Sequence, residues 1–240
     1  MNWKTCIVSL CFATSVLAGD DFKSANALYD AGKFANAAAV YETIQPKTAA
    51  VLFNLGNAHF RQEELGRAVL DFERARQLAP GDPDILANLR FAEERLGVVD
   101  LNVPARPIAR FWESVTVSRT IRQWSAWVVA GVWVIMLLVA GAIWWPRWRT
   151  GLVIVAVVAG IGLALAVAAL TDRVVSVPPA IVLARRAEAR FAPLPDATVH
   201  FQLGEGTKVL IREDRGQWWL VERCDGQQGW IKADVAERVF

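Results

Sequence analysis

The chain has 240 residues, of which 54% are hydrophobic and 21% are charged, and its net charge is only +2. This charge balance, without a long basic stripe, excludes an electrostatic nucleic-acid binder. Many apolar and many charged residues in one chain indicate separate hydrophobic and polar segments, which predicts a multidomain membrane protein rather than a single soluble domain.

Residues 1–18 have the pattern of a secretory signal peptide. Lys4 supplies the positive charge, and residues 6–17 form an apolar run that is too short to cross a bilayer comfortably. We expect cleavage after Ala18, with cleavage after Gly19 or an uncleaved signal anchor as the alternatives. Asp20 stands where a lipoprotein has its cysteine, so no lipid anchor is expected.

Residues 19–98 contain an internal helical repeat. The spacing of small, aromatic and proline residues from Gly56 through Phe72 to Pro80 resembles the tetratricopeptide repeat (TPR) almost position by position. An earlier copy lies 31 positions upstream, and a third copy begins at Pro83 and stops near Gly97 after one helix. The resemblance implies an all-α TPR array of two helix pairs and a capping helix.

In the TPR family the inner face of the first helices binds extended peptides. The matching positions in this chain are Phe22, Asn26, Tyr29, Asp30, Phe53, Asn57, Phe60 and Arg61. Asn26 and Asn57 occupy equivalent places, where an amide can hydrogen-bond the backbone of a ligand. The alternative is that these residues only pack and solvate repeats that dock on their neighbours.

Residues 99–123 read as a linker that ends in a basic amphipathic segment, which either lies on a membrane surface or extends a helix. Residues 124–145 and 151–170 are each apolar and long enough to cross a membrane, and the short connection between them requires an antiparallel transmembrane α-hairpin. Neither span contains Asp, Glu, Lys or His, which argues against a transporter or a channel.

Two further predictions concern this hairpin. Small residues spaced by four, at positions 156, 160 and 164, are expected to pack against the first span. The signal peptide would place both ends of the chain in the periplasm and the turn with Arg147 and Arg149 in the cytoplasm. Arg110, Arg119 and Arg122 before the first span conflict with that orientation under the positive-inside rule, and we follow the signal peptide.

Residues 179–240 change to short alternating segments separated by glycine turns, which predicts β-strands. Segments 206–209, 216–221 and 225–231 carry the glycine and tryptophan spacing of bacterial SH3 domains. This resemblance implies a C-terminal all-β SH3-like barrel. The sequence at 189–193, where the family has a conserved loop motif, departs from that motif. Whether the domain has an intact peptide-binding groove is therefore left undecided.

The aromatic residues of this region divide into two groups. Trp218 and Trp230 are expected in the core, because a barrel this small needs large side chains. Trp219 should then point the other way on its strand. Phe191 and Trp219 are therefore the candidate contact residues of this domain.

No motif typical of catalysis, of a cofactor or of a metal is recognisable in the sequence. His59 and His200 fall in different predicted domains without metal-ligand spacing, and His59 is expected to pack in its helix. A phosphate-binding glycine loop, a nucleophile elbow and a Cys/His pair are also missing. We therefore expect a protein that is not an enzyme and that has no cofactor.

The order of signal peptide, TPR array, two spans and SH3-like domain resembles the BatE-type proteins of the Bacteroides aerotolerance operon over essentially the whole chain. The resemblance implies an inner-membrane scaffold or adaptor that works with von Willebrand A domain membrane proteins and a MoxR-type ATPase in oxygen or envelope-stress tolerance. A partner touching both modules would gain from a high effective concentration. The alternative is an envelope protein whose SH3-like domain binds peptidoglycan peptides.

Overall fold

A computed structural model of the chain describes residues 20–99, 111–112, 115, 120–175 and 179–240. The predicted signal peptide and most of the predicted linker lie outside the described residues. The chain divides into two compact units. The described residues up to 99 form the first unit together with residues 179–240, and the residues between these segments form the second.

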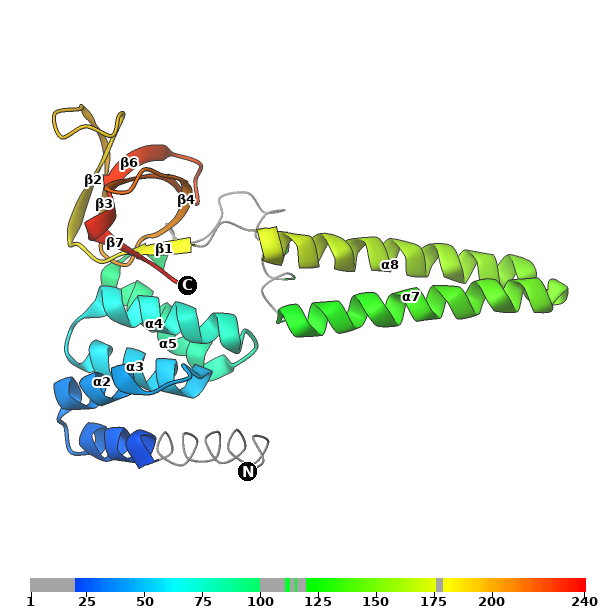
Figure 1. Cartoon of the computed structure of the whole chain (residues 1–240), viewed down its shortest axis with the longest axis horizontal. Coiled ribbons are helices and arrows are strands. Elements are labelled where there is room, and N and C mark those ends of the chain that lie inside the picture. The colour runs from blue at the N-terminus through cyan, green and yellow to red at the C-terminus, as the bar shows by residue number, and fades with distance from the viewer. Residues whose placement is uncertain (1–19, 100–110, 113–114, 116–119, 176–178) are drawn as a thin grey trace, which may run out of the picture. The chain divides into compact units, whose positions relative to one another are not determined.

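The amino-terminal part of the first unit is a row of helices joined by short turns (Figure 1). Residues 20–30 form the first helix. The helices that follow are α2 (Phe34–Thr43), α3 (Ala49–Arg61), α4 (Leu65–Leu78) and α5 (Pro83–Leu96). The helical array that the repeat pattern predicts is confirmed.

Local sequence determines where these helices begin and end. The Thr48 side chain accepts a hydrogen bond from the backbone N–H of Val51 and caps α3. The Asp82 side chain caps α5, whose first position is Pro83. Gly97 ends α5 in the left-handed conformation with φ of 70°, which glycine adopts without steric cost.

A close approach at Gly56 holds α3 against α4. The ring of Phe72 is buried, and a Cβ on Gly56 would lie 2.7 Å from two of its carbon atoms. Ala68 and Ala75 on α4 are also fully buried. A larger residue at position 56 would therefore separate the two helices.

The carboxy-terminal part of the first unit is an antiparallel sheet of seven strands. The strands are β1 (Pro179–Val182), β2 (Arg186–Arg190), β3 (Val199–Gly204), β4 (Lys208–Asp214), β5 (Trp218–Arg223), β6 (Gln228–Lys232) and β7 (Ala236–Arg238). Their order is β3-β2-β6-β5-β4-β1-β7, so β3 and β7 are edge strands and no pairing closes the sheet. The all-β prediction is confirmed at the level of an antiparallel sheet.

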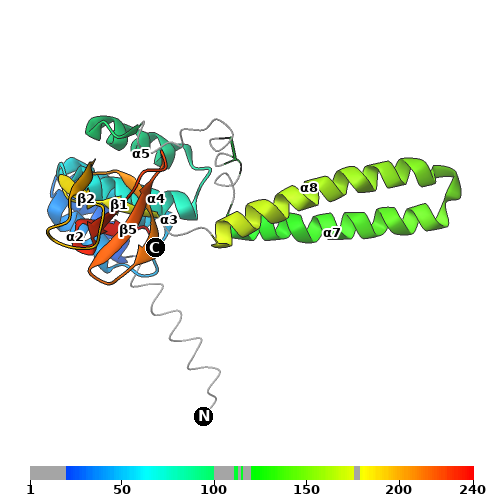
Figure 2. The ribbon, with the colours of Figure 1, turned by 90° about the horizontal axis from the view of Figure 1, so that it is seen from above.

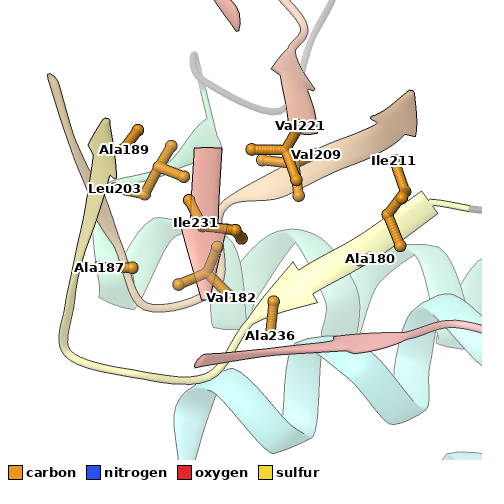
Figure 3. Close-up of a cluster of buried hydrophobic side chains, with 10 residues drawn as sticks. All are labelled: Ala180, Val182, Ala187, Ala189, Leu203, Val209, Ile211, Val221, Ile231 and Ala236. Atoms are coloured by element: carbon orange, nitrogen blue, oxygen red, sulfur yellow. The ribbon is translucent and has the colours of Figure 1, made fainter. Parts of the chain in front are cut away.

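Small and branched apolar side chains from several strands meet in the core of this sheet (Figure 3). The buried residues of the cluster are Ala180, Val182, Ala187, Ala189, Leu203, Val209, Ile211, Val221, Ile231 and Ala236. Trp230 of β6 is buried, with an exposed fraction of 8%, as predicted, although it is not a member of this cluster. The cluster itself is filled by small and branched side chains rather than by tryptophan.

The predicted directions of the β5 tryptophans, by contrast, are wrong. Trp219 lies opposite Ile231 and packs, partly buried, against the core. Because side chains alternate along a strand, Trp218 lies on the other face. Two adjacent tryptophans do not reveal which of them faces the core, whereas the buried Val221 two positions after Trp219 does.

The sheet packs directly on the helical array. Ala180 and Val182 of β1 face the sheet core, whereas Ile181 between them packs with buried residues of α4 and α5. Val239, after β7, joins the same cluster, and both Ile181 and Val239 are fully buried. We call this contact of Ile181 and Val239 with α4 and α5 the seam. Burying each of these two side chains stabilises the seam by roughly 1.5–3 kcal/mol.

Buried charges cross the seam as well. Glu73 of α4 is 3% exposed; it accepts a 2.7 Å hydrogen bond from Arg76 and lies 3.6 Å from Nζ of Lys208 on β4. Burial raises the pKa of Glu73, but Lys208 and Arg76 together outweigh burial and hold the pKa below its ordinary value. Arg74 donates to the backbone oxygen of Val239 at 2.8 Å.

Removing Lys208 tests the seam. We expect Lys208→Ala to lower the free energy of unfolding of the first unit by about 2 kcal/mol, because Glu73 stays buried with only one cation. The matched control, Arg212→Ala on the same strand, breaks an exposed pair with Glu222 and should cost less than about 1 kcal/mol. Pulse proteolysis of the detergent-solubilised chain in urea measures both, and equal effects would contradict the seam.

The same comparison has a defined pH dependence. The pKa of Glu73 lies below its ordinary value of 4.5 in the folded chain, so its stabilising contribution is complete above that value. The contribution is lost as pH falls through the pKa of the folded state. The difference between wild type and Lys208→Ala should therefore be constant near neutral pH and shrink as pH falls below the ordinary value of 4.5. A difference that grows on acidification would be inconsistent with this pair.

The second unit is a helical hairpin in which α7 (Ile121–Trp144) and α8 (Arg149–Val175) run side by side, as Figure 2 shows. A short 3₁₀ turn, Pro146–Trp148, connects them. Thr120 and Gln123 form a capping box at the start of α7. Both helices are long and apolar enough to cross a membrane.

The packing between these helices differs from the predicted one. Glycines of α7 meet leucines of α8: a Cβ on Gly131 would lie 3.2 Å from Leu163, and one on Gly141 would lie 3.4 Å from Leu152. The predicted small-residue stripe on α8 does not make this contact as a whole, since position 164 is exposed and the Cβ position of Gly160 is open. The helical phase places the leucines, not the whole stripe, toward α7.

Candidate functional site

Four of the predicted peptide-facing residues line one groove of the helical array. The groove has a volume of about 270 Å³. Its lining residues, which we call the asparagine groove, are Asn26, Tyr29, Asp30, Tyr41, Asn54 and Asn57. The first helix, α2 and α3 all contribute to it, so the groove exists only because the repeats stack.

The side chains of the two predicted asparagines, Asn26 and Asn57, are each held by hydrogen bonds to their own Oδ1 atom. Oδ1 of Asn26 accepts from the Tyr41 hydroxyl at 2.5 Å and from Nδ2 of Asn54 at 3.0 Å. Oδ1 of Asn57 accepts from Nδ2 of Asn88 at 2.8 Å. Within the described part of the chain, the Nδ2 group of each asparagine is left as the donor for a ligand. The arrangement therefore suits a ligand that offers carbonyl oxygens.

Burial keeps the Tyr41 hydroxyl in its protonated form. Desolvation raises the pKa of Tyr41 above 10.0, and the charge of Asp30 acts in the same direction, while the hydrogen bond with Asn54 opposes them. The hydroxyl is therefore a hydrogen-bond donor to Asn26 at any physiological pH. This bond ties α2 to the first helix beneath the groove.

The sequence pattern did not single out Tyr41, Asn54 or Asn88 for this role. One signal was available for Asn88, because the spacing of 31 that relates Asn26 to Asn57 also leads from Asn57 to Asn88. Asn54 lies about one helical turn before Asn57 on α3. No spacing rule relates Tyr41 to Asn26.

The other predicted residues of the inner face lie outside the asparagine groove. Phe22 packs against Tyr41, and Phe53 against Phe72, with ring centroids 6.0 and 5.9 Å apart. These two side chains belong to the helix cores, as the packing interpretation predicts. They fix the helices that carry the groove.

Phe60 and Arg61 make stacking contacts with neighbouring helices instead. The Phe60 ring lies 5.4 Å from that of Phe91, an exposed residue on α5. The Arg61 guanidinium lies 4.8 Å above the ring of Phe34. An aromatic and cationic surface therefore adjoins the groove residues along the chain.

The two sheet candidates do not line the asparagine groove. Phe191 follows β2, is 64% exposed and stacks on His200 with a centroid distance of 4.2 Å. Trp219 is partly buried, and the Arg238 guanidinium lies 5.1 Å from its ring. Phe191 is thus the more accessible of the two.

A second cleft, of about 370 Å³, contains a buried histidine–aspartate pair. Nδ1 of His59 lies 2.7 Å from Oδ2 of Asp71, and both side chains are nearly inaccessible. Burial raises the pKa of Asp71, whereas the bond with His59 and the charge of Arg74 lower it, and burial prevails.

The cleft around this pair is lined by charged and apolar residues, and none of its described lining residues is Ser, Thr or Cys. Lys47 lines it as well, and burial lowers the pKa of this lysine. Within the described residues, no group of three His, Cys, Asp or Glu side chains could hold a metal ion. His59 is buried and packed, as its helix position predicts, and Asp71 is the partner that the sequence pattern did not reveal.

In a comparison with known protein families, residues 49–82 match the model of the tetratricopeptide repeat. The match covers α3 and α4, the helix pair around Gly56 and Phe72. No curated protein matches the chain. The chain thus contains a TPR, a non-catalytic repeat that suggests a protein-interaction module and protein partners. It also contains two helices able to span a membrane.

The hydroxyl of Tyr41 provides a direct test of how the asparagine groove is built. Tyr41→Phe removes one of the two donors to Asn26 and should lower the free energy of unfolding by about 1 kcal/mol. Tyr29→Phe, which removes a hydroxyl from the groove wall, is the matched control and should change it by less than about 0.5 kcal/mol. Urea unfolding monitored by pulse proteolysis compares them, and a larger loss in the control would show that another contact orders the groove.

Proposed function

We propose that the chain is a non-enzymatic, two-pass scaffold of a bacterial inner membrane that binds an extended segment of a partner protein in the asparagine groove. The observation that carries this proposal is the groove itself, formed by four predicted ligand-facing residues in an array with a matched TPR. The groove is polar, open and built from stacked helices.

The chemistry of the groove defines the kind of segment that fits. Nδ2 of Asn26 and of Asn57 would each donate to a backbone carbonyl of the partner. Asp30 would favour a basic side chain, and the Tyr29 ring would cover an apolar one. An extended segment that still has free carbonyl groups meets these requirements, whereas a helix, whose carbonyls are already bonded, does not.

The connectivity of the first unit supports anchoring by two spans. Residues before the hairpin pack across the seam against residues after it. If α7 and α8 cross the membrane, both segments emerge on one side, as the seam requires. A single crossing would separate them. The predicted signal peptide would make this side the periplasm.

We further propose that the sheet is an SH3-like domain and that the protein belongs to a Bat-type complex. The order of the segments along the chain supports this assignment. The partners would be von Willebrand A domain membrane proteins and a MoxR-type ATPase. Because the seam fixes the sheet to the array, the scaffold would present one body rather than two independent modules.

Cross-linking in cells followed by affinity purification of the full chain tests the groove. We expect the double variant Asn26→Ala with Asn57→Ala to capture about tenfold less of the von Willebrand A partner than wild type, because two hydrogen bonds are lost. Asn36→Ala, at an exposed position of α2 outside the groove, is the control and should capture as much as wild type. Equal capture by all three proteins would reject the groove as the binding site.

Binding of peptidoglycan by the sheet is the second candidate. The exposed Phe191 and Leu194 after β2 favour it, because an apolar patch beside a stacked histidine suits a wall peptide. Co-sedimentation of the full chain with purified cell wall tests this candidate. Retention that is lost in Phe191→Ala would favour it, and no retention would eliminate it.

A further inference from the structure

A groove opens between α7 and α8 beside their connecting turn. Its volume is about 550 Å³. Its walls are apolar, with Val139 and Ile143 on α7 and Val153 and Val157 on α8, and these four side chains are exposed. The close approach of Gly141 to Leu152 brings the helix axes together here, and the larger side chains on either side form the walls.

One charged residue lines this groove, Arg149 at the start of α8. Residues 121–171 contain Arg122, Arg147 and Arg149 but no Asp or Glu. Arg149 is exposed and has no acidic partner among the described residues. A guanidinium at the end of a membrane-spanning helix reaches the headgroup layer, where an anionic phosphate can pair with it.

We propose that this groove binds an anionic phospholipid. One acyl chain would lie along the apolar walls, and the phosphate would accept hydrogen bonds from the Arg149 guanidinium, whose planar fork fits a phosphate. The inference rests on the proposed insertion of the hairpin into a membrane. It adds a specific ligand and names the residue that selects it.

The charge pattern favours a lipid over a second copy of the chain. Another hairpin packed into the groove would bring no carboxylate to Arg149, since residues 121–171 contain none. It would also place two cationic turns together, and like charges at close range repel. An anionic lipid supplies both the apolar chain and the missing negative charge.

The other end of the hairpin provides an internal comparison. A second groove there, of about 510 Å³, is lined by Trp124, Trp127 and Leu163 among other apolar residues, and no charged residue is among its described lining. The described walls of that groove can accept an apolar chain but offer no cation to a headgroup. Among the described residues that line the two grooves, Arg149 is the cation that can select an anionic headgroup.

Native mass spectrometry of the full chain in detergent, with equal amounts of phosphatidylglycerol and phosphatidylcholine of the same acyl chains, tests the proposal. Wild type should retain phosphatidylglycerol in preference. Arg149→Gln should reduce that preference about fivefold, the effect of one cation near anionic lipid. Arg147→Gln removes another exposed charge of the turn, one that does not line the groove, and it should change the preference less than about twofold.

Three results would overturn the lipid site. These are equal retention of both lipids by wild type, equal effects of the two substitutions, and a dimer or partner complex that carries no lipid. Alkaline extraction of membranes from the same cells separates this failure from failure of the proposed anchoring. A chain that resists extraction but shows no lipid preference refutes only the lipid site, whereas a chain released by alkali refutes both.

Discussion

A carboxylate buried where α4 meets the sheet is the constraint on which the rest of the first unit depends. Glu73 loses its hydration there, and Arg76 and Lys208 replace it with two cations. Lys208 lies on β4, far from α4 in sequence, so the carboxylate is satisfied only when the sheet is docked. Ile181 and Val239 bury their side chains in the same contact. Charge and apolar burial therefore select one arrangement of sheet and helices.

This arrangement determines which surfaces remain for partners. The sheet covers part of α4 and α5, whereas the asparagine groove is built by the first helix, α2 and α3. Docking the sheet therefore leaves the proposed binding groove open. The hairpin is inserted between the two segments that the seam joins, so the helices that could anchor the chain are continuous with both. A single compact unit whose chain continues into two potential membrane helices suits the proposed adaptor, whose partner has to be placed rather than chemically changed.

The sequence predicted what local spacing and hydropathy control, and it missed what depends on distant residues. The pattern of small and aromatic residues around Gly56 and Phe72, which recurs 31 positions upstream, predicted the helices of the array. Two long apolar runs predicted the helical hairpin. The two adjacent tryptophans, Trp218 and Trp219, do not indicate which of them faces the core. The prediction therefore assigned the core face to Trp218, whereas Trp219 packs against the core. Pairings between residues distant in sequence, such as that of Glu73 with Lys208, follow from tertiary packing and leave no periodic pattern. The continuous apolar run at 180–183 is the sequence signal that corresponds to burial of β1 on both faces.

The central claim is that the segments before and after the hairpin form one unit on one side of a membrane. Labelling of intact cells with a membrane-impermeant thiol reagent tests it most directly, with single cysteines at Gly81, Gln217 and Arg147 in a chain whose native cysteines are replaced. The account predicts that the first two positions react from one side and that Arg147, in the turn, reacts only from the other. Labelling of Gly81 and Gln217 from opposite sides would contradict it, because the seam could not then form.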